Sequence, residues 1–546
     1  MKIGQKQTLS NPRASWLIGL ALVFALGLFL GGRDPLSPVQ YWLPSLPLSL
    51  GHQSSVDHLP TLTVDMPFDS YRNLLQQREA ALRAGGYLSR RADFVMATIR
   101  LRDSVVPVNV RFRDGTAQHL EQAQGWQFDV RARQDQTLNG MERFYLLDPA
   151  DNNWLNQWAF ARSLEREGIL TARYAFVNLV FNGHSWGTYA LQEGFGDALM
   201  TRNDRVPGVL LAFDTDLLWR SIARFGDAEH TYADPVGKLT STAFPFLEVD
   251  AFSDAAIDRD VARSNQRDVA VSRMRALQAG QVPPSEVFDV ETYARFLSLV
   301  DLWGANEAVS VANLRYYYDP DTGRVEPIGF VGNPLSSEER LPMAATHGDT
   351  GLQAAYAREA KRVSDPAYLD GLRAELEEDL LRLQRILQRH AGEMDLPWEA
   401  LEQRQAWMRH SIDPIQPVFA YLGDATTSVS ATIEIDVANV VNLPIEVIGF
   451  DINGTTFLEA DPAWLRTDPN PDLVIVRGNQ LVLIASSSNT PRYVRFHLPT
   501  TEIVRLDAES HFMHPTEISV ATRILGLDGH QLTPAREGAP DSLVAP

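Results

Sequence analysis

Residues 174–193 read YAFVNLVFNGHSWGTYALQE. Apolar side chains recur through Tyr174–Phe181 and again through Thr188–Gln192, a pattern typical of strands that pack one face on a core. Asn182-Gly183 lies between them, and this dipeptide is favoured in two-residue hairpin turns because both positions tolerate a positive φ. The stretch therefore predicts a β-hairpin, which we take as the starting point for the fold.

The turn of this hairpin also fits the pattern G-x-S-x-G, since residues 183–187 read GHSWG. In α/β-hydrolases the serine of this motif lies on a sharp turn from a strand into a helix. Here a second strand, not a helix, is expected after Ser185. We therefore interpret Ser185 as a hairpin residue and reject the alternative that the protein is a hydrolase with Ser185 as its nucleophile.

The segments around the hairpin predict a mixture of helices and short strands. Residues 94–112 alternate apolar and polar side chains around Asp103-Ser104, which predicts a second hairpin. Pro366 stands at a favourable first-turn position of a long helix. The remaining elements are helices near 69–84, 153–167, 259–280 and 289–305, and strands at 314–318 and 324–330.

The chain changes character near residue 428, where short alternating apolar runs and turn signals begin to recur. This pattern predicts a separate β-sandwich-like domain. The expected organisation is a cytoplasmic stub and anchor at 1–33, a Pro/Ser-rich spacer at 34–60, a main domain at 61–345, a helical extension at 346–424, the β-sandwich-like domain at 425–534 and a disordered tail at 535–546.

Residues 14–32 contain no charged side chain, and at about 1.5 Å per residue they can just cross a hydrocarbon core of roughly 30 Å. Lys2, Lys6 and Arg13 precede the stretch, and no Lys or Arg follows Arg33 until Arg72. Basic flanks stay in the cytoplasm. The sequence thus predicts a single-pass inner or plasma membrane protein with its C-terminal bulk periplasmic or extracellular. A cleaved signal peptide is the alternative.

The amino-acid composition excludes several kinds of catalytic site and partner. The chain has no cysteine, which excludes disulfides, thiol catalysis and thiolate metal sites. Its formal net charge is −20, so we expect no nucleic-acid partner. Lysines occur only at 2, 6, 238 and 361, which leaves arginine as the cation of most of the chain.

Several blocks between about 108 and 334 resemble the CotH family, secretory proteins with an atypical protein-kinase-like fold, and more closely a bacterial membrane-anchored subgroup of it. The order and the spacing of these blocks along the chain are similar to those of the corresponding segments in the family. The blocks are RFR at 111–113, WQFDVR at 126–131, NGMERF at 139–144, NGHSWGTYALQE at 182–193, GVLLAFD at 208–214, DLWGA at 301–305, NLRYY at 313–317 and EPIGF at 326–330.

The resemblance implies an α+β fold class: an atypical kinase-like CotH domain with a helical extension and a C-terminal β-sandwich-like domain, preceded by one transmembrane helix. It also implies an ATP-dependent protein kinase that uses Mg²⁺ or Mn²⁺ in active members. The candidate cofactor-binding residues that it implies are Arg111, Arg113, Arg131, Glu193 and Asn313. For Glu193 and Arg111 a structural ion pair is the alternative, and for Asn313 capping of a loop.

The sequence departs from this pattern where phosphoryl transfer is most demanding. Asn306 stands where the resemblance implies the catalytic Asp, and Val331 where it implies the metal-binding Asp. A neutral amide cannot accept a proton as a carboxylate does, and valine offers no oxygen to Mg²⁺. Asn306 and the adjacent Glu307 remain the catalytic candidates, and Asn313 the metal candidate.

We therefore expect a degenerate kinase that acts as a binding or assembly factor in the cell envelope or exopolysaccharide, with an envelope protein or polysaccharide as partner. It would recognise a phosphorylated or polyanionic ligand. Two alternatives stay open: an active atypical kinase that phosphorylates Ser or Thr, and a structural or adhesion protein that works through its β domain.

Overall fold

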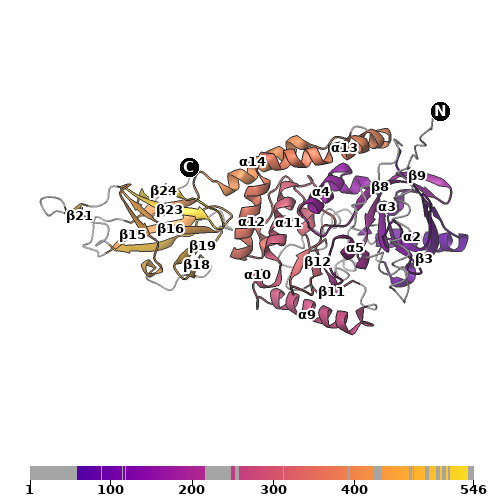
Figure 1. The fold of residues 1–546 in the computed structure, drawn as a ribbon, viewed down its shortest axis with the longest axis horizontal. Coiled ribbons are helices and arrows are strands. Elements are labelled where there is room, and N and C mark those ends of the chain that lie inside the picture. Colours follow the sequence, from indigo (N-terminus) through magenta and orange to yellow (C-terminus); the bar gives the residue numbers. More distant parts are fainter. Residues whose placement is uncertain are drawn as a thin grey trace, which may run out of the picture. The chain divides into compact units, whose positions relative to one another are not determined.

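A computed structural model describes residues 58–538 except 88, 114, 117, 215–246, 253–256, 312, 392–393, 424–431, 466–469, 471–472, 486–490, 500–504, 507–511 and 514–516. The residues from His58 onward form one compact unit. In Figure 1 the colours of its elements follow the chain, from the indigo strands of the N-terminal region to the yellow strands of the C-terminal region.

The N-terminal region is a closed barrel with the strand order β1-β3-β4-β6-β7-β9-β8. Neighbouring strands are antiparallel except β1 and β8, which pair in parallel and close the barrel. Asn182 fastens this seam, since its Oδ1 accepts a hydrogen bond of 2.7 Å from the backbone N–H of Met66. The strands are β1 (Thr61–Asp65), β3 (Val95–Leu101), β4 (Ser104–Phe112), β6 (Phe128–Ala132), β7 (Arg143–Leu147), β8 (Tyr174–Phe181) and β9 (His184–Glu193).

Aromatic side chains fill the barrel. The ring of Phe128 stacks on those of Phe112 and Phe181 at centroid distances of 5.8 and 5.6 Å. Helix α2 (Phe68–Ala84) adds Leu74 and Ala81 to the same core. Successive residues of a strand point to opposite faces. The neighbours of these inward residues, among them Arg111 and Asp129, therefore lie on the outer face.

A second sheet follows, with the order β11-β10-β12-β13 and antiparallel pairing throughout. Its strands are β10 (Val209–Phe213), β11 (Val249–Ala251), β12 (Arg315–Tyr318) and β13 (Val325–Pro327). The helices of this part of the chain are α4 (Leu155–Arg166), α5 (Asp197–Arg202), α9 (Val261–Gln278), α10 (Pro284–Val287), α11 (Val290–Leu302), α12 (Thr350–Val363), α13 (Pro366–Ala391) and α14 (Trp398–Ile412).

A buried ion pair fixes α11 to this helical region. Asp301 is fully buried, and the guanidinium of Arg340 binds its carboxylate at 2.6 Å. The hydroxyl of Tyr356, on α12, donates a hydrogen bond of 2.6 Å to the same carboxylate. Burial alone would raise the pKa of Asp301, but Arg340 and Tyr356 outweigh that effect and hold the pKa below its ordinary value.

Two larger sheets of the C-terminal region share one hydrophobic core with the helical region, and a short two-stranded sheet of β21 (Arg505–Leu506) and β22 (Phe512–Met513) accompanies them. In the first, β25 (Arg536–Glu537) pairs with β14 although it lies in the predicted disordered tail. The first sheet contains β14 (Val418–Leu422), β15 (Thr432–Asn439), β20 (Val494–Pro499) and β25. The second contains β16 (Ile445–Ile452), β17 (Thr456–Glu459), β18 (Val474–Arg477), β19 (Gln480–Leu483), β23 (Ile518–Ile524) and β24 (Gln531–Pro534).

The predicted fold class is wrong. The resemblance implied a kinase-like domain over residues 61–345, whereas the structure builds this region from a closed seven-stranded barrel and a separate four-stranded sheet. The quoted blocks specify local hairpins, and the pairing of β1 with β8 that closes the barrel lies outside them. Within the described residues, no helix is long and apolar enough to span a bilayer. The predicted span, 14–32, lies outside those residues.

Candidate anion-binding site on the barrel

Five arginines gather beside the outer face of the barrel, and the strand register explains the positions of three of them. Arg111 on β4 lies opposite Asp129 on β6, which in turn lies opposite Tyr145 on β7. Two residues further along β6, on the same face, Arg131 lies opposite Arg143 of β7. Neighbouring strands are about 4.8 Å apart, so these side chains crowd one another. We call Arg111, Arg113, Arg131, Arg143 and Arg315 the arginine face.

Asp129 is the carboxylate at the centre of the arginine face. Its side chain is buried, with 2% of the residue exposed, and it accepts hydrogen bonds from Arg143 and Arg111 at 2.8 to 2.9 Å. Burial would raise its pKa, but the charges of Arg143, Arg111 and Arg131 outweigh burial and lower it. Asp129 therefore stays ionised and serves as an internal counter-ion.

Arg131 is less well compensated. Its Nε is buried and has no hydrogen-bond partner among the described residues. The guanidinium lies 4.7 Å from the ring centroid of Phe94, and that of Arg111 lies 4.4 Å from the same ring. Burial and the charge of Arg143 lower the pKa of Arg131 to about 10, against the attraction of Asp129. The residue remains cationic at neutral pH.

Arg113 and Arg315 complete the arginine face. Arg113 lies 5.6 Å from the ring centroid of Tyr145, over which Arg143 also lies at 5.3 Å. Arg315 begins β12 of the second sheet, and its guanidinium lies about 6 Å from the ring of Phe195. Burial, together with the positive charges of Arg113 and Arg143, lowers the pKa of Arg315 to about 10 against the attraction of Tyr145. The rings of Phe195, Phe330 and Tyr145 follow one another at centroid distances of 4.7 and 5.8 Å, and they link Arg315 to the two arginines over Tyr145.

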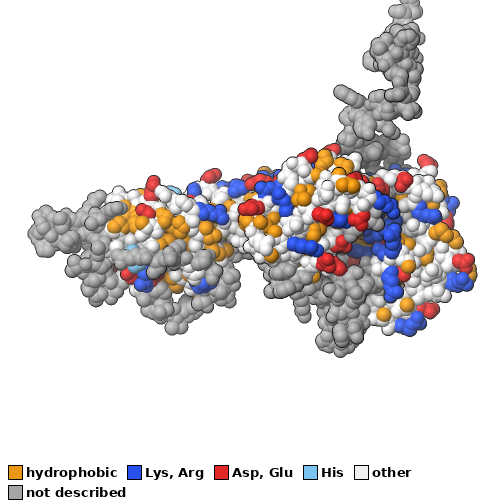
Figure 2. Space-filling view, turned by 90° about the horizontal axis from the view of Figure 1, so that it is seen from below, with side chains coloured by type: hydrophobic (Ala, Val, Ile, Leu, Met, Phe, Trp, Pro, Cys, Tyr) orange, Lys and Arg blue, Asp and Glu red, His pale blue; other side chains and the backbone are white. Residues whose placement is uncertain are grey.

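The sum of these charges is positive on a protein that is acidic overall. Figure 2 shows basic side chains gathered in a band next to the barrel. Planar guanidinium groups can bind phosphate or carboxylate through two parallel hydrogen bonds. Asp151, held by the side-chain amide of Gln127, is a second carboxylate near Arg113. The arrangement can therefore attract an anion with more than one charge.

Three of the predicted cofactor-binding residues, Arg111, Arg113 and Arg131, lie on the arginine face. Sequence reasoning did not select Arg143 and Arg315 as site residues. A signal for Arg143 existed, because a β6–β7 hairpin of the right register puts it opposite Arg131. For Arg315 there was none, since it comes from a different sheet.

Glu193 lies elsewhere, at the end of β9, and is engaged internally. Its carboxylate is buried and binds Arg173 at 3.0 Å and Arg202 at 2.8 Å. These two ion pairs join β9 to the residues before β8 and to α5. The structure thus places Glu193 in the ion-pair role that we kept as an alternative, although with other arginines than Arg111.

Of the remaining candidates, Asn313 and Glu307 form a hydrogen-bonded loop group with Asn333. The Nδ2 of Asn313 donates to the backbone carbonyl of Glu307 at 3.1 Å, and the Nδ2 of Asn333 donates to the carboxylate of Glu307 at 2.9 Å. Asn306 donates instead to Ser337 at 3.1 Å. Asn313 therefore caps a loop in this structure.

Val331, at the predicted metal position, is buried beside Phe330. The ring of Phe330 lies 5.8 Å from that of Tyr145, so residues 330–333 run from the arginine face to the loop group. No group of three potential metal ligands among His, Asp and Glu occurs within the described residues.

Ser185 lies within a continuous strand. It pairs with Val180 across the β8–β9 hairpin, and β9 runs on to Glu193 without passing into a helix. The strand-to-helix turn of a hydrolase nucleophile is therefore missing at this motif. This agrees with our interpretation of Ser185 as a hairpin residue.

Searches against protein-family models and against curated proteins found no match to the chain. The resemblance to the CotH family thus stays a prediction that rests on the quoted blocks.

Proposed function

We propose that the chain is a binding module that recognises a polyanionic ligand through the arginine face and performs no phosphoryl transfer there. The observation that carries the proposal is a cluster of five arginines from two sheets, in which Arg111 and Arg143 bind the buried Asp129 and Arg131 lies within electrostatic range of it. Phosphorylated and multiply carboxylated compounds are the ligand classes that such a surface attracts.

Binding without catalysis is the better reading of the residues present. Asp129 has a lowered pKa and two arginine partners, so it is a poor proton acceptor. Glu307 already accepts a hydrogen bond from Asn333, and the neighbouring candidate, Asn306, is an amide. These features leave electrostatic attraction as the main property of the site.

The ligand should carry several charges rather than one. Like charges held close together repel, and one monovalent anion could neutralise only part of the positive charge. A ligand with two or more anionic groups could contact Arg113 beside the barrel and Arg315 on β12 at the same time. An anionic envelope polysaccharide or a phosphorylated envelope protein fits this description and the predicted compartment.

Calorimetric titration of the full chain tests the proposal. Pyrophosphate and tripolyphosphate should bind, tripolyphosphate more tightly, and affinity should fall as salt rises because salt screens exposed charges. Arg113→Gln and Arg131→Gln should each weaken binding about tenfold, as expected for one lost charge-assisted hydrogen bond.

Arg382→Gln is the matched control, because Arg382 lies on α13, far along the chain from the barrel, and pairs only with the exposed Asp379 among the described residues. Its affinity for both anions should equal that of the wild type. Equal weakening by Arg382→Gln and Arg131→Gln would point to a non-specific charge effect and would remove the arginine face as the site.

A further inference from the structure

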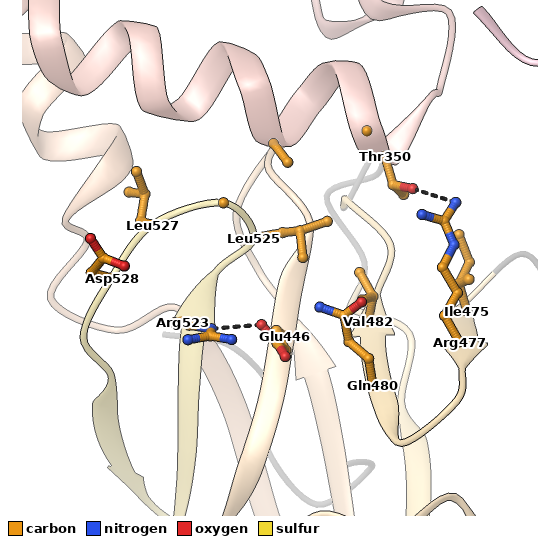
Figure 3. Close-up of a pocket in the computed structure, with 13 residues that line it drawn as sticks. Thr350, Glu446, Ile475, Arg477, Gln480, Val482, Arg523, Leu525, Leu527 and Asp528 are labelled. Atoms are coloured by element: carbon orange, nitrogen blue, oxygen red, sulfur yellow. Dashed lines mark hydrogen bonds and ion pairs between the residues drawn. The ribbon is translucent and has the colours of Figure 1, made fainter. Parts of the chain in front are cut away.

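A groove of about 370 Å³ lies where the first turn of α12 meets the second sheet of the C-terminal region. Figure 3 shows α12 along one side and strands β16, β18, β19 and β23 along the other. Ligand sites commonly have volumes of roughly 300 to 1,000 Å³ and often occur where two structural regions meet. The groove therefore has the size of a site for one small molecule.

Two contacts between α12 and the sheet hold the walls of the groove in place, and neither contact involves the arginine face. Arg477 on β18 donates a hydrogen bond of 3.1 Å to the hydroxyl of Thr350. Gly526 has a φ of +91° and packs so closely on α12 that a methyl group there would lie 2.5 Å from the carbonyl oxygen of Ala354. Because the helix and the sheet are fastened at both contacts, the space between them is formed before any ligand arrives.

The polar lining of the groove is balanced in charge. Arg477 and Arg523 oppose Glu446 and Asp528, and the Arg523–Glu446 pair is already closed at 2.6 Å. Figure 3 shows Gln480 and Asp528 on opposite sides of that pair. Neither side chain has a hydrogen-bond partner among the described residues of the lining. Both are therefore available to a ligand.

This composition selects against strongly charged ligands. An anion would gain from the arginines but lose against Glu446 and Asp528, and a cation would meet the opposite balance. A ligand rich in hydroxyl groups can instead donate to Asp528, exchange two hydrogen bonds with the amide of Gln480, and accept from the arginines. Apolar walls formed by Leu525 and Val482 suit the C–H faces of the same kind of molecule.

The geometry points to a second binding site, in this groove, for a neutral hydroxyl-rich ligand of the size of one or two sugar rings. It does not depend on the proposed function of the arginine face. Gln480 and Asp528 supply the hydrogen bonds that recognise the hydroxyl groups, and the Arg523–Glu446 pair forms the polar floor between them.

Saturation-transfer difference NMR on the full chain tests this site, with glucose and cellobiose as neutral probes and glucuronate as the charged one. The neutral sugars should bind with a dissociation constant on the order of 1 mM. Glucuronate should bind more weakly. Gln480→Ala and Asp528→Ala should each weaken neutral-sugar binding about tenfold.

Two controls keep the result interpretable. Glu459→Ala changes an exposed carboxylate on β17, outside the groove lining, and should leave sugar binding unchanged. Thermal unfolding of each variant shows whether the domain still folds. No signal from either neutral sugar, or equal signals from folded wild-type and Asp528→Ala proteins, would overturn the assignment. Tighter binding of glucuronate that disappears in Arg131→Gln would assign sugar contact to the arginine face instead.

Discussion

Two parallel hydrogen bonds of 2.8 Å join the guanidinium of Arg143 to the carboxylate of Asp129, one from Nε to Oδ1 and one from Nη2 to Oδ2. This fork-to-fork contact bridges β6 and β7 on the outer face of the barrel. Arg111 approaches the same carboxylate from β4, so one buried anion orders three neighbouring strands.

Replacing Asp129 by Asn should destabilise the protein. The amide cannot balance Arg111 and Arg143, and breaking a buried ion pair typically costs about 3 kcal/mol or more. The free energy of unfolding in urea measures the loss. Asp69→Asn, which breaks the exposed Asp69–Arg72 pair, should change it by less than about 1 kcal/mol. Similar values for both variants would show that the central carboxylate is not a structural counter-ion.

Replacing Arg131 by Gln should have the opposite effect on stability. Its buried Nε lacks a partner within the described residues, and its charge lies close to that of Arg143. Removing one cation should raise the free energy of unfolding by about 0.5–1 kcal/mol while anion affinity falls, since binding sites often sacrifice stability for function. A variant that loses both stability and affinity would identify Arg131 as a structural residue.

Removing the hydroxyl of Tyr356 should weaken the helical region. The Tyr356→Phe variant leaves one oxygen of Asp301 without its 2.6 Å hydrogen bond in a fully buried place. A lost hydrogen bond to a buried charged group costs about 1.5–3 kcal/mol. Denaturant unfolding should show this loss with an unchanged slope. A variant as stable as the wild type would mean that Arg340 and the backbone N–H of Leu341 satisfy Asp301 without the tyrosine.

His347 should make stability depend on pH. Burial lowers its pKa from 6.5 to about 4, against the attraction of Asp349, and its ring stacks on that of Phe288 at 5.9 Å. Between these two pH values the unfolded chain binds a proton that the folded chain does not. The contribution of the neutral His347 to the free energy of unfolding is therefore complete above about pH 6.5, and it is lost as the pH falls towards 4.

The measurement for His347 is unfolding at pH 4, 5, 6 and 8 of the wild type and of His347→Asn. Asparagine has no titrating ring and tolerates the φ of 51° at this position. The difference in stability between the two proteins should shift in favour of the variant below pH 6.5. A difference that stays constant with pH would show that His347 titrates normally.

Local elements could be predicted because their signals are local. The predicted hairpin at 174–192 is confirmed as β8 and β9, and its turn residues have the expected positive φ values, 48° at Asn182 and 79° at Gly183. The predicted long helix is confirmed as α13, which begins at Pro366. In each case a few adjacent residues carry the information.

The closure of the barrel could not be predicted in the same way. Thr61 pairs with Asn178, and no periodicity within either segment specifies that contact. The resemblance supplied the wrong architecture because hairpins of this kind fit both an open sheet and a barrel. The arginine face was only partly predicted for a related reason: a charged residue in the sequence does not reveal whether its partner is internal, as for Glu193, or external.

The parallel seam between β1 and β8 also sets an order of events during synthesis. Residues 61–65 leave the ribosome first, yet their partner in the seam is the strand at 174–181. Until that later strand emerges, β1 can pair only with β3, and one of its edges stays exposed. Contacts so distant in sequence form slowly, because the loop between them loses entropy on closing. The barrel therefore stays open along one edge of β1 until the β8–β9 hairpin has left the ribosome.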